Sequence, residues 1–138
     1  MTRKKMLFCC IMICLCSFLF LACQGKKAIA QPQKDLDFQI VMMEQVPQEV
    51  TQMIEEKKQT PFSFTYKEEK SLYICVGYGE KNSGGYSITV EHLSEAENAV
   101  YVKTNLIGPN KEDFQIQGTS YPCLVIQTED IDKAVVFE

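Results

Sequence analysis

The chain has 138 residues, of which 14 are Lys or Arg and 18 are Asp or Glu, a formal charge of −4. The first 22 residues hold three charges, all basic, so the remainder carries 11 basic and 18 acidic residues, a charge of −7. An acidic chain lacks the clustered Lys and Arg that displace counterions from a phosphate backbone, which excludes nucleic acid as the expected partner.

The N-terminus reads as an export signal. Arg3, Lys4 and Lys5 precede an apolar run, residues 6–22, whose single polar side chain is Ser17; a basic start and a short apolar run are typical of a secretory signal peptide. The run ends at Cys23, after which the composition turns polar, and this stretch resembles the lipobox of bacterial lipoproteins. The resemblance implies cleavage of residues 1–22, a lipid on Cys23 and a place on the extracytoplasmic face of a bacterial cell membrane.

An uncleaved transmembrane helix is the alternative. The run of 17 residues stands at the lower end of the roughly 17–25 that span a bilayer. Both interpretations place residues 24–138 outside, because the positive flank stays in the cytoplasm.

Residues 23–35 are polar and read as a flexible tether, and residues 36–138 are enough for one small core. An apolar-rich segment, 36–44, is the first expected strand. Val50, Met53 and Ile54 then recur at helical spacing and predict an amphipathic helix over 47–58, with Pro47 in its first turn.

The rest of the chain reads as strands. The alternating segments 62–68 and 71–79 predict a hairpin whose second strand is central, since it is apolar on both faces. Four further strands are expected, at 85–93, 99–106, 123–128 and 134–138, joined by short polar turns. These elements predict a small single α+β domain, mainly antiparallel β, with the early helix packed on a β-sheet or β-sandwich.

Most of the seven cysteines fall in or next to the signal segment. Only Cys75 and Cys123 remain for the domain, on separate predicted strands, where they form either one disulfide or two buried hydrophobic side chains. With one histidine beside them, no metal site is expected, and no cofactor motif is present. By alternation, His92 lies on the same face of its strand as Ile88 and Val90, which predicts a structural rather than a catalytic role.

Three connections stand out from the strand pattern. Gly84 and Gly85 interrupt the segment 79–86, which is either a recognition loop or a hairpin turn. The segment 108–118 is long enough for a binding element, and Pro122 holds Tyr121 extended before the next strand. No nucleophile–base arrangement or paired carboxylate suggests catalysis, so the chain is not expected to be an enzyme.

Residues 46–137 resemble the PrcB family, the C-terminal domain of protease-complex-subunit lipoproteins. The shared features are a short helix before the first hairpin, the element Gly-Glu-x-x-x-Gly-Gly-Tyr-Ser-Ile at 79–88, a proline in a long loop, and a Tyr-Pro step before an apolar strand. The resemblance implies a non-catalytic accessory subunit that binds a secreted protease. The implied partner-binding residues are Gly84, Gly85, Tyr86, Pro109, Thr119, Tyr121 and Pro122.

Two other functions stay open. A glycine-rich loop ending in Gly-Tyr is similar to a loop of the chagasin-like inhibitors, which implies a protease inhibitor of β-sandwich type. An apolar pocket between helix 47–58 and the sheet would instead favour a small-ligand or cell-wall-binding module.

Overall fold

The computed structural model describes residues 32–110 and 116–138. The predicted signal peptide, Cys23 and most of the predicted tether lie outside these residues. Residues 31–138 form one compact unit. No helix within the described ranges is long and apolar enough to cross a membrane.

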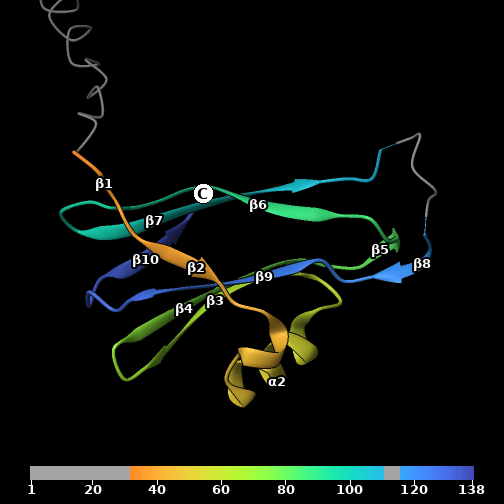
Figure 1. Ribbon diagram of the computed structural model, residues 1–138, viewed down its shortest axis with the longest axis horizontal. Coiled ribbons are helices and arrows are strands. Elements are labelled where there is room, and N and C mark those ends of the chain that lie inside the picture. The colour runs from red at the N-terminus through yellow and green to blue at the C-terminus, as the bar shows by residue number, and fades with distance from the viewer. Residues whose placement is uncertain (1–31, 111–115) are drawn as a thin grey trace, which may run out of the picture. The chain divides into compact units, whose positions relative to one another are not determined.

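Most described residues lie in strands, which form two four-stranded sheets and a short ribbon (Figure 1). Sheet A has the order β1-β6-β7-β10, and its strands are β1 (Lys34–Asp35), β6 (Ser87–Glu95), β7 (Ala99–Ile107) and β10 (Ala134–Phe137). Sheet B has the order β2-β9-β4-β3, and its strands are β2 (Phe38–Ile40), β9 (Cys123–Glu129), β4 (Ser71–Tyr78) and β3 (Pro61–Glu68). The ribbon pairs β5 (Lys81–Ser83) with β8 (Gln117–Ser120).

The predicted hairpin is confirmed. Strands β3 and β4 pair antiparallel over their whole length, from Pro61 opposite Tyr78 to Glu68 opposite Ser71. Glu69 turns the chain with a positive φ of 52°. Strand β4 lies between β9 and β3, so the central position expected for this strand is also correct.

The helix-side core lies between sheet B and the amphipathic helix, which is α2 (Gln48–Lys57). A short 3-10 turn, η2 (Met43–Gln45), leads into it. Val50 and Ile54 of α2 are buried against Tyr73, Cys75 and Val125 of sheet B. The helical periodicity predicted these contacts, because residues four apart lie on one face of a helix.

The inter-sheet core lies on the opposite face of sheet B. Ile74 and Ile126, which face each other on β4 and β9, are fully buried against Val100 and Val102 of sheet A. Sheet B is therefore a middle layer with α2 on one side and sheet A on the other (Figure 1). Burial on both faces explains why β4 is almost continuously apolar.

The predicted α+β class is wrong, because this is a mainly-β domain. Strands make up 56% of it and helices 13%, and the strands belong to several sheets. One short helix covers only one face of one sheet, while the other face is covered by a second sheet. The layering therefore follows β-sheet packing rather than a segregation of helices and strands.

The arrangement is also not wholly antiparallel. Strand β10 pairs parallel to β7, with Ala134 opposite Ala99 and Phe137 opposite Val102. The acidic connection after β9 does not form a hairpin, because it carries the chain from sheet B to sheet A. Short connections predict sequential pairing by default, and only the packing of the two sheets reveals this crossover.

The expected first strand at 36–44 is shorter than predicted. Only Phe38–Ile40 forms a strand, β2, and residues 43–45 form η2 instead. The described end of the predicted tether contacts the domain, because Lys34 and Asp35 form β1 opposite Glu95 and Ser94.

The face expected for His92 is wrong because β6 contains a bulge. Val90 lies opposite Thr104, but His92 lies opposite Lys103, the neighbouring residue on β7. An extra residue in one strand reverses the side-chain alternation. The His92 ring consequently leaves the core face, and its Nε2 lies 2.7 Å from Glu138 Oε2.

Candidate functional site

The two loops predicted to bind a partner meet in the β5–β8 ribbon. Lys81 pairs with Ser120 and Ser83 with Gln117, across a register shift. The Gly84 N–H donates to the Ile116 carbonyl at 2.9 Å, which extends the pairing beyond the strand. Segments 79–86 and 116–122 therefore form one structural element.

Gly85 allows the segment after β5 to approach the loop after β7. Its φ is +84°, in the left-handed region that side chains rarely adopt, and a Cβ on it would lie 3.0 Å from Pro109 Cβ. Gly108 passes close to the Tyr86 ring, since a Cβ there would lie 3.6 Å from Tyr86 Cε1. The glycines thus place Tyr86 and Pro109 side by side, as close backbone approach requires.

Tyr121 is held from two directions. Its hydroxyl donates to Glu80 Oε2 at 3.1 Å and accepts from Gln59 Nε2 at 3.4 Å. The Lys58 ammonium lies 5.0 Å from the centre of the ring, within the range of a cation–π contact. Three contacts to one ring fix its orientation.

The Lys58 ammonium also binds Glu55 Oε2, and this hydrogen bond raises the pKa of Lys58. Next to Tyr121, the Pro122 carbonyl accepts from the Tyr78 N–H at 3.0 Å. The end of α2 and the end of β4 thus fix the Tyr-Pro step before β9.

The structure brings the seven predicted partner-binding residues to the ribbon and the segments beside it. Thr119 and Gly85 are exposed, and the other five are half-buried: Gly84, Tyr86, Pro109, Tyr121 and Pro122. The sequence did not indicate three further residues of this surface, namely Lys58, Gln59 and Ile116. Lys58 and Gln59 follow α2 and are distant in sequence from the ribbon, so no local pattern could identify them. Ile116 lies in a mostly polar loop, in which Phe114 is the other large apolar residue.

Cys75 and Cys123 are free thiols on adjacent strands. They share the face of sheet B that α2 covers, but Cys75 pairs with Val125 and Cys123 with Gly77, so they are diagonal neighbours. Burial raises the pKa of Cys75 to about 12, with a smaller contribution from Cys123. A thiol with so high a pKa is a poor nucleophile at neutral pH.

A hollow of about 340 Å³ opens between the two sheets, on the side of sheet B away from α2. Its lining includes Val76, Val102, Thr104 and Phe137. The Tyr78 hydroxyl and Thr104 Oγ1 form a hydrogen bond of 2.8 Å across it. This is a different place from the pocket considered beside helix 47–58, where Val50 and Ile54 fill the interface with the sheet.

The fold and the ribbon together define a small mainly-β domain with a surface built at one end from two distant loops. Residues 72–129, from β4 to β9, match the family model described as PrcB C-terminal. The match covers 58 of the 138 residues and confirms the predicted resemblance to the PrcB family over this stretch. No curated protein and no solved structure matches the chain.

Proposed function

We propose that this protein is a non-catalytic accessory subunit of an exported protease complex, and that it binds its partner through the β5–β8 ribbon. The family match supports association with a protease complex. The main support for this surface is the pairing of two loops within the matched region, which meet at Ser83 and Ser120, 37 residues apart in the chain. Loops held on a rigid scaffold are where binding residues concentrate.

The side chains of this surface suit a protein partner. Tyr86, Tyr121 and Pro109 provide rigid apolar area, and Ile116 is 66% exposed next to them. Aromatic anchors supply most of the binding energy in many interfaces, because they bury a large area and lose little conformational entropy. The contacts of Tyr121 to Glu80, Gln59 and Lys58 order it before a partner arrives.

The proposal places the protein outside the cell, on the extracytoplasmic face of the membrane, with a lipid on Cys23. The basic start and the short apolar run before Cys23 support this location. Two or more acyl chains on one residue give stable anchoring, at about 0.8 kcal/mol per buried methylene. The anchor would hold the ribbon close to the membrane, where it can bind an exported protease.

A binding comparison tests the ribbon. The anchored protein is purified from membranes with its partner, once as wild type and once as Tyr86→Ala. Recovery of the partner should fall about tenfold, since truncating one aromatic anchor costs roughly 1–2 kcal/mol or more. Tyr101→Ala is the matched control, because Tyr101 is also half-buried but lies on β7 opposite Ser94.

Equal recovery with both variants would remove the ribbon from the proposal. Thermal unfolding of both variants separates a lost contact from a lost fold. An inhibition assay against papain-type and subtilisin-type proteases decides the main alternative. Tight inhibition that is lost in Tyr86→Ala would make the protein an inhibitor and not an accessory subunit.

A further inference from the structure

Four large apolar side chains are exposed within six residues along β2 and the following turn. Their exposed fractions are 41% for Phe38, 56% for Ile40, 63% for Met42 and 36% for Met43. These four residues are called the β2 patch. Large exposed apolar side chains that are contiguous mark an interaction surface in soluble proteins, whereas scattered ones do not.

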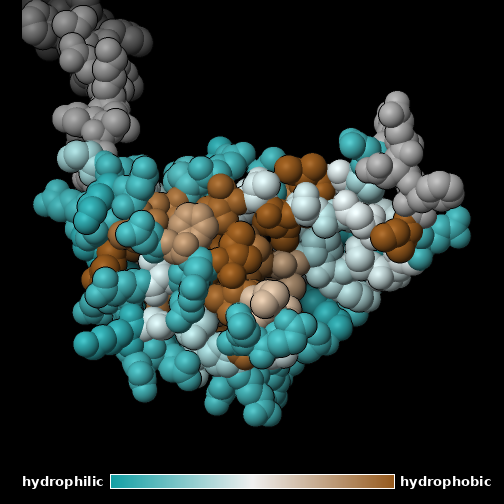
Figure 2. All heavy atoms as spheres, viewed as in Figure 1, coloured by the Kyte–Doolittle hydropathy of each residue, from teal (hydrophilic) through white to brown (hydrophobic). Residues whose placement is uncertain are grey.

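The β2 patch lies along an edge strand of sheet B. Ile40 and Phe38 pair with Ile126 and Thr128 at the edge of sheet B, and β2 has no second neighbour in the described chain. Figure 2 shows apolar atoms gathered over β2, β9 and β6 on this side of the domain. The patch is separate from the β5–β8 ribbon.

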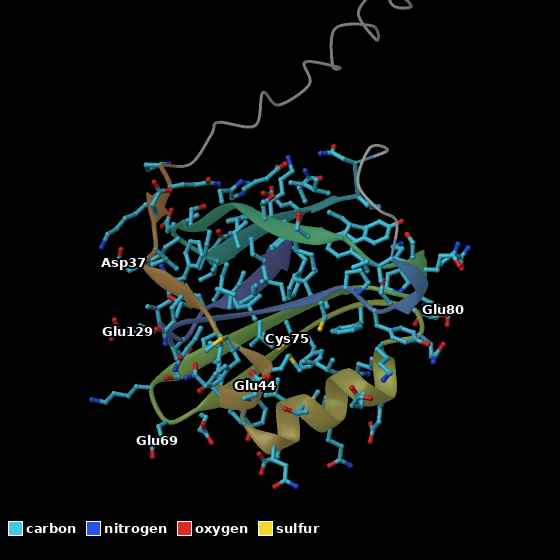
Figure 3. All side chains as sticks on the ribbon, turned by 45° about the vertical axis from the view of Figure 1, so that its right-hand side comes forward. Asp37, Glu44, Glu69, Cys75, Glu80 and Glu129 are labelled. Carbon is cyan, nitrogen blue, oxygen red and sulfur yellow. The ribbon has the colours of Figure 1, made fainter. Side chains whose placement is uncertain are left out.

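Carboxylates border the β2 patch. Asp37 and Glu129 line the same shallow hollow as Phe38, together with Lys70, and Glu44 adjoins Met43 in η2. Figure 3 shows Asp37 and Glu129 beside β2 and Glu44 at the turn, while Glu80 lies on the opposite side. All three are exposed, and none forms an ion pair with another described residue.

With three carboxylates and one ammonium, that of Lys70, the border carries a net charge of −2, and this charge decides between the possible occupants of the patch. In a two-fold dimer formed through the β2 patch, the carboxylates of one copy would lie against the same carboxylates of the other. Like charges would then oppose the dimer. An anionic bilayer would repel them, by about 1 kcal/mol for each charge near its surface. A protein surface of apolar side chains bordered by Lys or Arg would bury the patch and pair with the carboxylates.

We propose that the β2 patch is a second docking surface, and that it binds a segment of an exported protein in which large apolar side chains alternate with Lys or Arg. The alternation expected in the partner matches that of β2. Phe38 and Ile40 lie on one face of this strand, and Gln39 lies between them on the other face. That the segment belongs to an exported protein rests on the location proposed above. The surface itself acts independently of the ribbon and stands whether or not the ribbon binds a protease.

Two synthetic peptides of about 12 residues test this surface, one alternating Leu with Lys and the other alternating Leu with Glu. Residues 31–138 form a compact unit that contains both cores, so this fragment is used. Fluorescence anisotropy should show binding of the Leu-Lys peptide at least about tenfold tighter than of the Leu-Glu peptide. The preference should shrink as salt rises.

Variants locate the binding. The double variant Ile40→Ser, Met42→Ser should weaken binding of the Leu-Lys peptide about tenfold, and Glu44→Lys should weaken this binding severalfold. Val136→Ser and Glu56→Lys are the controls: Val136 is 39% exposed on β10 of sheet A, and Glu56 lies on α2. Both should bind within about twofold of wild type.

Three results would overturn the proposal. The first is equal weakening by the control variants, which would mean attraction to the whole acidic domain. The second is sedimentation with phosphatidylglycerol vesicles that Ile40→Ser abolishes, which would make the patch a membrane contact. The third is a dimer of the fragment, seen by analytical ultracentrifugation, that Ile40→Ser dissociates.

Discussion

At the scale of single residues, Gly77 shows how one missing side chain shapes the helix-side core. It lies on β4 opposite Phe62 of β3, and the Phe62 ring lies over it. A Cβ at position 77 would stand 2.1 Å from Phe62 Cε1. The Phe62 ring, which stacks on Phe64 with centres 5.7 Å apart, can hold its position only because residue 77 has no side chain.

Gly77→Ala should therefore destabilise the domain by about 1–3 kcal/mol, because the Phe62 ring must move. Urea unfolding of the fragment 31–138 measures this change. Gly108→Ala is the control, since its nearest neighbour, Tyr86 Cε1, would be at an ordinary 3.6 Å. Equal stability of the two variants would show that the Phe62 ring shifts without cost.

The two thiols should differ in reactivity. Cys75 is fully buried with a pKa of about 12, while Cys123 is half-buried with its pKa raised by burial. At about pH 8, a thiol reagent should modify Cys123 first and Cys75 only as the fragment unfolds, because the thiolate is the reacting form. Mass spectrometry against time follows each site.

Thiol counting also checks whether the two cysteines, which are free in the structure, stay free in the exported protein. If unfolded protein prepared from the exported material yields thiols only after reduction, the two cysteines are bonded. If both native thiols react at one rate, the burial of Cys75 does not protect it.

At the scale of elements, the connection between β9 and β10 links sheet B to sheet A and is fastened at both ends. Lys67 of β3 binds Asp130 at 3.0 Å and Asp132 at 3.2 Å. Lys133 binds Glu95 at 2.5 Å and donates to the Ala96 carbonyl at 2.9 Å. These contacts attach the crossover to β3 and to the end of β6.

Acid should weaken this connection. The Asp132 N–H, and after it Lys67, lower the pKa of Asp130, and Lys133 lowers that of Glu95. A carboxyl whose pKa is lower in the folded state stabilises it fully above its unfolded pKa, and this contribution is lost as the pH falls through the folded value. The free energy of unfolding should thus decrease from about pH 5 downward.

Urea unfolding between about pH 7 and about pH 3 measures this decrease. Asp130→Asn should make the slope with pH shallower, because residue 130 then has no proton to gain. Lys67→Met should reproduce part of the change by removing the cation. Identical slopes in wild type and both variants would exclude Asp130 as a source of the acid sensitivity.

At the scale of the whole molecule, the proposed function depends on anchoring as well as on the domain. Cys23→Ser should prevent lipidation, and the protein should lose incorporation of labelled palmitate. If the signal is a lipobox, the wild type should run at the mass of residues 23–138 plus lipid. A wild-type protein that retains residues 1–22 and incorporates no palmitate would support the transmembrane alternative.

Local periodicity predicted most of the individual elements. The helix predicted at 47–58 occurs at 48–57, and the strands expected at 62–68, 71–79, 99–106 and 123–128 occur within a residue or two. In each, the pattern of buried side chains is a property of neighbouring residues. The Gly-Gly-Tyr element pointed to the ribbon for a similar reason, because positive φ at Gly85 is a local requirement.

Contacts between distant segments decided the rest. The parallel pairing of β10, the β5–β8 ribbon and the placing of Lys58 over Tyr121 all join residues far apart in the chain. The bulge that turns His92 outward, and the second sheet that makes the domain mainly β, also depend on a partner strand. A sequence shows which face of a strand is apolar, but the strand's neighbours are chosen by packing and by the pairing of backbone hydrogen bonds across the sheet.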